Sequence, residues 1–162
     1  MAQQFKVAAT GGTFDEIHAG HIALLSKAFE VADHVIIGVS SDKFAAKRGK
    51  KLNHDYDTRV SNLKRLIAQK FGTPDYTIAR LEGEFGPAVT TGHVDVLVAS
   101  SETAVRGEEL NATRKTRGLK PVAVISVDLV LAEDGNPISS TRIRRGEIDA
   151  QGKILKYSER PS

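Results

Sequence analysis

Short runs rich in valine and isoleucine alternate with amphipathic stretches along most of the chain. Continuous apolar runs of this length are typical of strands buried on both faces, because a half-exposed strand would alternate apolar and polar residues. The pattern therefore predicts five strands, at residues 5–10, 34–41, 75–81, 94–100 and 121–132.

Between these runs, apolar residues recur at the three- and four-residue spacing of a helix with one buried face. In 19–32, Ile22, Leu25 and Phe29 share a face, and 55–71 shows the same periodicity. A polar helix is expected over 102–118, ending near Gly118, and a helical start over 139–148. The expected connections are a basic loop at 42–54, a short link at 84–90 and a turn at 133–137, and the last residues are expected to be a helix fragment or a frayed tail.

Strand–helix alternation with buried strands indicates an α/β fold, a Rossmann-like doubly wound sheet of five parallel strands with helices on both faces. The 162 residues contain no internal repeat and no linker-like segment. We therefore expect a single domain over 1–162, with ligands binding at the carboxyl ends of the strands.

Composition narrows the class of protein. No cysteine is present, which excludes disulfides and thiolate metal sites. The N-terminus lacks the charged and apolar regions of a signal peptide, and no apolar run is long enough to cross a bilayer. We expect a cytoplasmic protein without a membrane partner.

The net charge is only +3, but basic residues are clustered. Residues 43–51 carry five positive charges and no acid, and 141–145 carry three more. Such local clusters suit a phosphate-bearing small molecule better than a nucleic acid, which favours a broad basic face interleaved with aromatics. Taken alone, each cluster is equally compatible with a solvated loop or helix end.

The stretch "GGTFDEIHAGH" (11–21) joins the first expected strand to the first helix. Its glycines let backbone N–H groups approach an anion at the start of a helix, where Thr13 adds a hydroxyl. His18 and His21 share a helix face that Gly20 keeps open, and two imidazoles there could stabilise charge developing at a phosphorus. A metal-binding pair or a helix cap are the alternatives. The glycine spacing does not fit the G-x-G-x-x-G motif, and no Gly-Lys-Ser/Thr follows as in a Walker loop.

The stretch "ISSTRIRRG" (138–146) follows the last expected strand. Ser139, Ser140 and Thr141 have the propensity of helix N-caps, and Arg144 falls on the face of Ser140. Hydroxyls and a guanidinium would converge there on one anion, unless the segment is only a cap followed by solvated arginines.

The two stretches together resemble the H-x-G-H and I-S-S-T-x-x-R signatures of the nucleotidyltransferase superfamily. Their particular forms are most similar to the archaeal and eukaryotic type of phosphopantetheine adenylyltransferase. "YDTRV" (56–60) and "LVASSETAVRGEELNATR" (97–114) resemble further segments of that family. The similarity covers a core of about 5–147 and leaves a C-terminal tail, 148–162.

The resemblance implies roles for the matching residues. His18 and His21 would bind the triphosphate and stabilise the transition state, and His21 is the stronger candidate because threonine replaces the first histidine in many superfamily members. Lys50, or a neighbour within 47–51 such as Lys47, would bridge both substrates. The expected phosphate-binding residues are Gly12, Thr13, Ser139, Ser140, Thr141 and Arg144, with Phe14 and Gly20 beside them.

The adenine and ribose would lie against Ser101, Glu102 and Thr103. Arg106 and Arg114 are candidates for the roles of arginines that bacterial forms carry after the fourth strand. Asp15 is expected to shape the turn rather than to take part in chemistry.

The resemblance implies reversible transfer of an adenylyl group from ATP to 4′-phosphopantetheine, which gives dephospho-coenzyme A and pyrophosphate. No protein metal site is expected, and Mg²⁺ would accompany the ATP phosphates. Another nucleotidyltransferase (FAD synthetase, nicotinamide mononucleotide adenylyltransferase or cytidylyltransferase) is the alternative, followed by a non-catalytic nucleotide-binding module. Monomer and homo-oligomer are equally compatible with the sequence.

Overall fold

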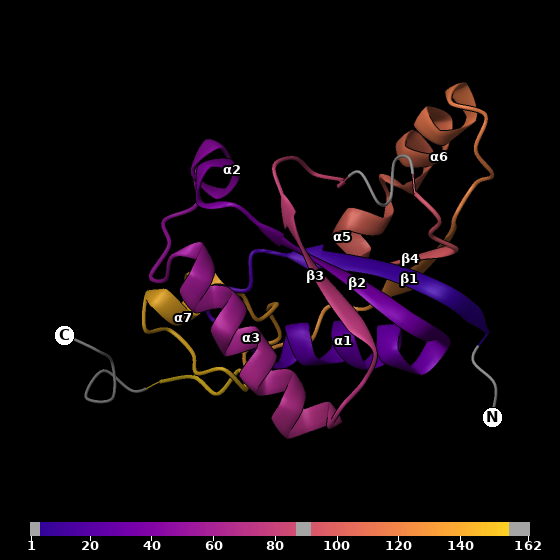
Figure 1. Ribbon diagram of the computed structural model, residues 1–162. Helices are drawn as coiled ribbons and strands as arrows, with labels where there is room; N and C mark the ends of the chain where they lie inside the picture. Colours follow the sequence, from indigo (N-terminus) through magenta and orange to yellow (C-terminus); the bar gives the residue numbers. More distant parts are fainter. Residues whose placement is uncertain (1–3, 87–91, 156–162) are drawn as a thin grey trace.

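The computed structural model describes residues 4–86 and 92–155, and Figure 1 shows a central sheet with helices packed on both sides. Five parallel strands form this sheet in the order β3-β2-β1-β4-β5, which confirms the expected fold class. The strands are β1 (Phe5–Gly12), β2 (Ala32–Ser40), β3 (Tyr76–Leu81), β4 (Val96–Ser100) and β5 (Ala123–Val127). Strand order reverses between β1 and β4, so a crevice opens at their carboxyl ends.

Apolar residues at alternate strand positions pack into two separate cores, one on each face of the sheet. Because both faces are buried, the apolar runs in the sequence are continuous. On one face, Ala8 of β1 and Ile37 of β2 pack with Leu25 and Leu63 from the helices α1 (Ala19–Val31) and α3 (Tyr56–Phe71). On the other face, Ala9 and neighbouring strand residues pack against Leu110 of α6 (Gly107–Thr116).

Three expected segments differ from the structure. The first half of the basic loop is a helix, α2 (Asp42–Lys47), because the Ser41 hydroxyl accepts a 3.0 Å bond from the Phe44 N–H and caps it. The polar helix is two helices, α5 (Ser101–Ala104) and α6, and Gly118 follows α6 with a φ of 73°. The fifth strand ends at Val127, since the following residues turn back on themselves through a bridge from Leu131 to Pro137.

The last described residues fold back onto the start of α1. After α7 (Ser140–Arg144), a bridge joins Ile148 to Ile154, and the Ala19 N–H donates a 3.0 Å hydrogen bond to the Ala150 carbonyl. The Glu133 N–H also donates to the Gly152 carbonyl at 2.8 Å and the Leu155 N–H to the Glu147 carbonyl at 3.0 Å, so the expectation of a frayed tail or helix fragment is wrong for 152–155. Residues 156–162 and 87–91, which include 87–90 of the expected short link, lie outside the described part of the chain.

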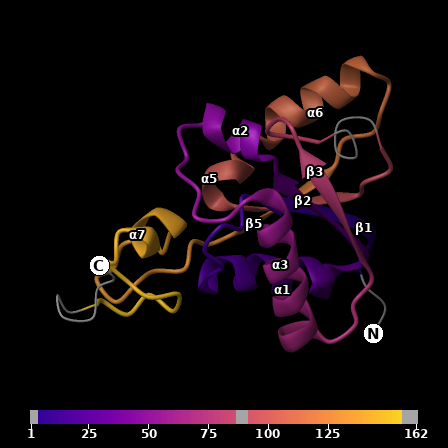
Figure 2. The ribbon, with the colours of Figure 1, turned by 60° about the vertical axis from the view of Figure 1, so that its left-hand side comes forward.

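Figure 2 shows α7 and its flanking loops projecting beside the N-terminal end of α1. This arrangement brings the stretches 11–21 and 138–146, which are far apart in the sequence, next to each other. None of the helices in the described ranges combines the length and apolar character that spanning a bilayer would require.

Candidate active site

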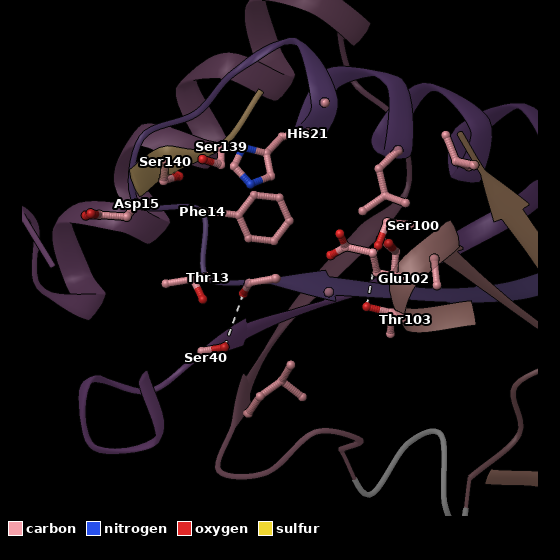
Figure 3. Close-up of a pocket in the computed structure, with 18 of the residues that line it drawn as sticks. Thr13, Phe14, Asp15, His21, Ser40, Ser100, Glu102, Thr103, Ser139 and Ser140 are labelled. Carbon is pink, nitrogen blue, oxygen red and sulfur yellow. Dashed lines mark hydrogen bonds between the residues drawn. The ribbon is translucent and has the colours of Figure 1, made fainter. Parts of the chain in front are cut away.

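A cavity of about 350 Å³ lies at the crevice between β1 and β4. Its walls come from the turn after β1, the start of α1, residues 48 and 50, the β4–α5 connection and α7. Figure 3 shows the His21 and Phe14 rings beside Ser139 and Ser140, with Ser100, Glu102 and Thr103 on the opposite side. The cavity thus joins segments from both halves of the sequence.

The two histidines form a reciprocal cap at the start of α1. The Gly20 N–H donates 3.0 Å to Nδ1 of His18, and the His18 N–H donates 3.2 Å to Nδ1 of His21. Because both Nδ1 atoms act as acceptors, each neutral ring carries its proton on Nε2. The helix-cap alternative and the ligand-binding hypothesis are therefore compatible, since each ring caps through one nitrogen and keeps the other as a donor.

Burial keeps these rings neutral. It lowers the pKa of His18 to about 4, and it lowers the pKa of His21 well below its usual range, with the charges of His18 and Lys50 acting in the same direction. The rings are stacked with centroids 3.9 Å apart, which would make two imidazolium ions repel. A Cβ on Gly20 would lie 2.8 Å from the His18 ring, so this tight arrangement requires glycine.

The side chains of Thr13 and Lys50 contact each other at the wall of the cavity. The Lys50 Nζ donates to the Thr13 hydroxyl at 3.4 Å. Partial burial is the main cause that lowers the pKa of Lys50; Arg48 and Arg144 lower it further, and Asp15 opposes them. The next residue, Phe14, has a φ of 55°, a backbone conformation that is rare for a bulky side chain.

The α7 segment is tied to the β1–α1 turn by Ser140 and Arg144. The Ser140 hydroxyl donates to the Glu16 carbonyl at 3.0 Å and accepts from the Glu16 N–H at 3.2 Å. A guanidinium nitrogen of Arg144 lies 2.8 Å from the buried Asp15 carboxylate. Ser139 caps α7 by accepting from the Arg142 N–H at 3.1 Å.

Most of the predicted site residues line this one cavity. They are Gly12, Thr13, Phe14, His18, Gly20, His21, Lys50, Glu102, Thr103, Ser139, Ser140, Thr141 and Arg144.

Four predicted residues lie elsewhere. Lys47 is exposed at the end of α2, and Ser100 takes the place at the cavity wall that was expected for Ser101. Arg106 pairs with Glu84 at 2.8 Å. Arg114 is buried, and its guanidinium donates 2.8 Å to the Lys120 carbonyl, where it fastens the loop after α6.

Two functional contacts were missed at the sequence level. Asp15 does shape the turn, since it accepts from the Asn53 and His54 N–H groups, but its bond to Arg144 also joins the two motifs. Arg59 is completely buried behind the turn, where its guanidinium donates 2.7 Å to the Thr13 carbonyl. The arginine of the "YDTRV" stretch was the available signal, because an arginine on the apolar face of an amphipathic helix needs a buried partner.

In residues 4–86 and 92–155, no three histidine, aspartate or glutamate side chains gather as a metal-binding group. The donors around the cavity are instead imidazole, ammonium, guanidinium and hydroxyl groups, which suit phosphate oxygens.

A family model described as cytidylyltransferase-like matches residues 9–146. The chain belongs to the cytidylyltransferase-like family. Within it, the chain is 44% identical to a phosphopantetheine adenylyltransferase of Methanothermobacter thermautotrophicus, with 96% of this chain and 93% of the relative covered. It is 38% identical to the enzyme of the same name from Methanopyrus kandleri, over 90% and 92% of the two chains. These relatives confirm the resemblance that the two motifs indicated.

Solved structures of other proteins agree with the fold. A protein of unknown function from Archaeoglobus fulgidus is 30% identical, with a TM-score of 0.68 over 76% of this chain and 89% of that one. A lipopolysaccharide core biosynthesis protein from Thermoplasma volcanium has a TM-score of 0.61 at 21% identity, over 75% and 95% of the two chains. The second likeness concerns the fold alone.

Proposed function

We propose that the chain transfers the adenylyl group of ATP to 4′-phosphopantetheine and releases pyrophosphate. One observation carries the proposal: His21, Lys50 and Arg144, which come from three distant segments, line the same cavity. The names of the family members in the preceding subsection supply the identity of the two substrates.

In this reaction a phosphate oxygen of the acceptor attacks the α-phosphorus of ATP. A new P–O bond forms, the bond from the α-phosphorus to the bridging oxygen of the β-phosphate breaks, and pyrophosphate leaves with that electron pair. A phosphomonoester is already ionised near neutral pH, so the enzyme needs no general base. The demands are in-line positioning and neutralisation of charge on the phosphates.

The side chains of the cavity match these demands. His18 and His21 would donate from Nε2 to the α-phosphate, where charge grows in the transition state. Lys50 and Thr13, which already touch each other, would hold the acceptor phosphate near the α-phosphate. Arg144 and Thr141 would bind the departing pyrophosphate, since these two residues form one hydrogen-bonded pair at 3.1 Å.

Mg²⁺ would add charge neutralisation when it is bound to the triphosphate. The donors of the cavity fit phosphate oxygens rather than a cation, so we expect Mg²⁺ to enter on ATP and to be held chiefly by its oxygens.

A substrate panel tests this function. The chain is incubated with ATP or CTP and with 4′-phosphopantetheine, nicotinamide mononucleotide or flavin mononucleotide, and pyrophosphate is measured. We expect release only with ATP and 4′-phosphopantetheine. Preference for CTP or for another acceptor would indicate one of the related transferases, and tight ATP binding without turnover for any acceptor would indicate a binding module.

A further inference from the structure

Among the described residues, Arg59 is the largest side chain that is completely buried, and it carries a positive charge. Its guanidinium donates to the Thr13 carbonyl at 2.7 Å, the Ser40 carbonyl at 2.8 Å, the Asp42 carboxylate at 2.8 Å and the His54 carbonyl at 3.1 Å. A buried cation is tolerated only where its donors find partners, and these four acceptors take up four of the five N–H groups of the guanidinium.

The four acceptors lie at two places: the carboxyl ends of β1 and β2, and the two ends of segment 42–54. Thr13 and Ser40 lie at the carboxyl ends of the neighbouring strands β1 and β2, so one nitrogen of Arg59 fixes the spacing of these ends. Asp42 and His54 are the first and last residues of segment 42–54. Arg59 therefore holds both ends of this segment from behind the site.

Segment 42–54 carries two cations of the cavity wall, Arg48 and Lys50. The Lys50 ammonium reaches the Thr13 hydroxyl, while Arg59 holds the carbonyl of the same threonine. The orientation of this peptide group also supports the left-handed conformation of Phe14, whose ring packs against His21. Arg59 thus affects the placement of both Lys50 and His21, the two residues proposed to contact the reacting phosphates.

We infer that Arg59 is a positioning residue that sets the reach of Lys50 by clamping both ends of segment 42–54. The inference rests on the proposed function in so far as Lys50 contacts substrate phosphates. A merely structural role would stabilise the fold without fixing where the lysine lies.

Two variants separate these roles. Arg59→Lys keeps the charge but cannot reproduce a planar group with four acceptors. Asp42→Asn releases the front end of the segment and is expected to fold, because the Asp42 side chain is 54% exposed. Arg65→Lys, on the exposed face of the same helix, is the matched control.

For adenylyl transfer, we expect Arg59→Lys to lower kcat by about tenfold to a hundredfold, since small misplacements of reacting groups carry such penalties. Asp42→Asn should lower it by about three- to tenfold, for the same reason. The Kd for ATP should stay within about threefold of the wild type, because the other phosphate-binding groups keep their places. If both variants instead bound ATP more weakly and kept the kcat of the wild type, the inference would be overturned.

A second readout does not depend on turnover. The rate at which an amine-directed acylating reagent labels Lys50, relative to exposed Lys64, is followed by mass spectrometry near pH 8. Lys50 is surrounded by Arg48, Arg144 and Asp15, and its lowered pKa makes it reactive. If segment 42–54 is released, the amine becomes more hydrated, its pKa rises, and the labelling ratio near pH 8 falls by about two- to fivefold relative to the same ratio at high pH, where both amines are deprotonated and the ratio reports accessibility alone.

The sign of this change is diagnostic in Asp42→Asn. The charges that act on the pKa of Lys50 are those of Arg48, Arg144 and Asp15, so loss of the Asp42 charge alone should leave the labelling unchanged, whereas release of the segment slows it. Slower labelling in the folded variants supports the clamp, and unchanged or faster labelling overturns it. If the wild-type chain failed to transfer adenylyl groups at all, the proposed function would fail while the labelling ratio still decided the role of Arg59.

Discussion

The Asp15 carboxylate and the Arg144 guanidinium, 129 residues apart in the sequence, meet at 2.8 Å. The Asp15 side chain is fully buried and that of Arg144 is 14% exposed, so water screens the pair little. Asp15 also accepts from two backbone N–H groups, those of Asn53 and His54. One carboxylate therefore fixes the β1–α1 turn, the end of segment 42–54 and α7 against one another.

Replacing Asp15 with asparagine should destabilise the fold substantially. The variant keeps the side-chain shape but leaves the Arg144 guanidinium without a charged partner in a mostly buried place, which costs about 2–4 kcal/mol. Urea unfolding measures the loss. Asp57→Asn, at an exposed position of α3, serves as the control, and a loss no larger than in this control would show that the pair is not a structural link.

Loss of the two histidines should have different consequences. His21→Ala removes the Nε2 donor from the more buried ring, and kcat for pyrophosphate release should fall by about a hundredfold to a thousandfold. His18→Ala also removes the cap that accepts from the Gly20 N–H, so it should cost about 1 kcal/mol of stability as well. Exposed His93→Ala should change neither quantity. Full pyrophosphate release by His21→Ala would refute the role of this ring.

Stability should decline in mild acid because of the buried histidines. The pKa of His18 is about 4 in the folded chain and about 6.5 in the unfolded chain, so only the unfolded chain takes up a proton between these values. Stability is therefore unaffected by this group above pH 6.5 and falls by up to about 3 kcal/mol as the pH drops towards 4, with His21 acting in the same direction.

Unfolding in urea at several pH values between 7.5 and about 4.5 checks this dependence. His18→Asn retains an acceptor for the cap but has no titrating ring, so its curve should be flatter than that of the wild type. Parallel curves for the two proteins would contradict the assignment.

Thr10 has a buried hydroxyl whose removal should stabilise the chain. Among the described residues, its Oγ1 is the only buried side-chain nitrogen or oxygen that lacks a hydrogen-bond partner. Thr10→Val keeps the shape and removes the unsatisfied group, for a gain of about 1 kcal/mol in thermal or urea unfolding. Thr77→Val, which removes a hydroxyl bonded to His34, should not show this gain. Destabilisation by Thr10→Val would mean that the hydroxyl has a bound partner.

The sheet and its two main helices could be predicted from the sequence because their hydrophobic periodicity is strong. The α2 helix was missed because only Ala45 of its six residues is buried, so it leaves little amphipathic pattern. The break between α5 and α6 and the early end of β5 depend on tertiary contacts, such as the packing of Gly107 against Val124. Local propensity does not contain that information.

The site residues that lie in motifs could be predicted, whereas the contacts between residues distant in the sequence could not. His21 and Arg144 stand in recognisable stretches, and both line the cavity. The link from Asp15 to Arg144 and that from Arg59 to Thr13 span 129 and 46 residues, and one sequence does not reveal such contacts. The same holds for Arg106 and Arg114: Arg106 pairs with Glu84 at the edge of the cavity, and Arg114 donates to a backbone carbonyl of the loop after α6.

The most direct test of the central claim follows the α-phosphate of ATP. The chain is incubated with 4′-phosphopantetheine and with ATP radiolabelled at either the α- or the γ-phosphate, and the products are separated by chromatography. The account predicts that the α-label appears in dephospho-coenzyme A and the γ-label in pyrophosphate. Transfer of the γ-label to the acceptor, or no transfer of the α-label to 4′-phosphopantetheine, would contradict it.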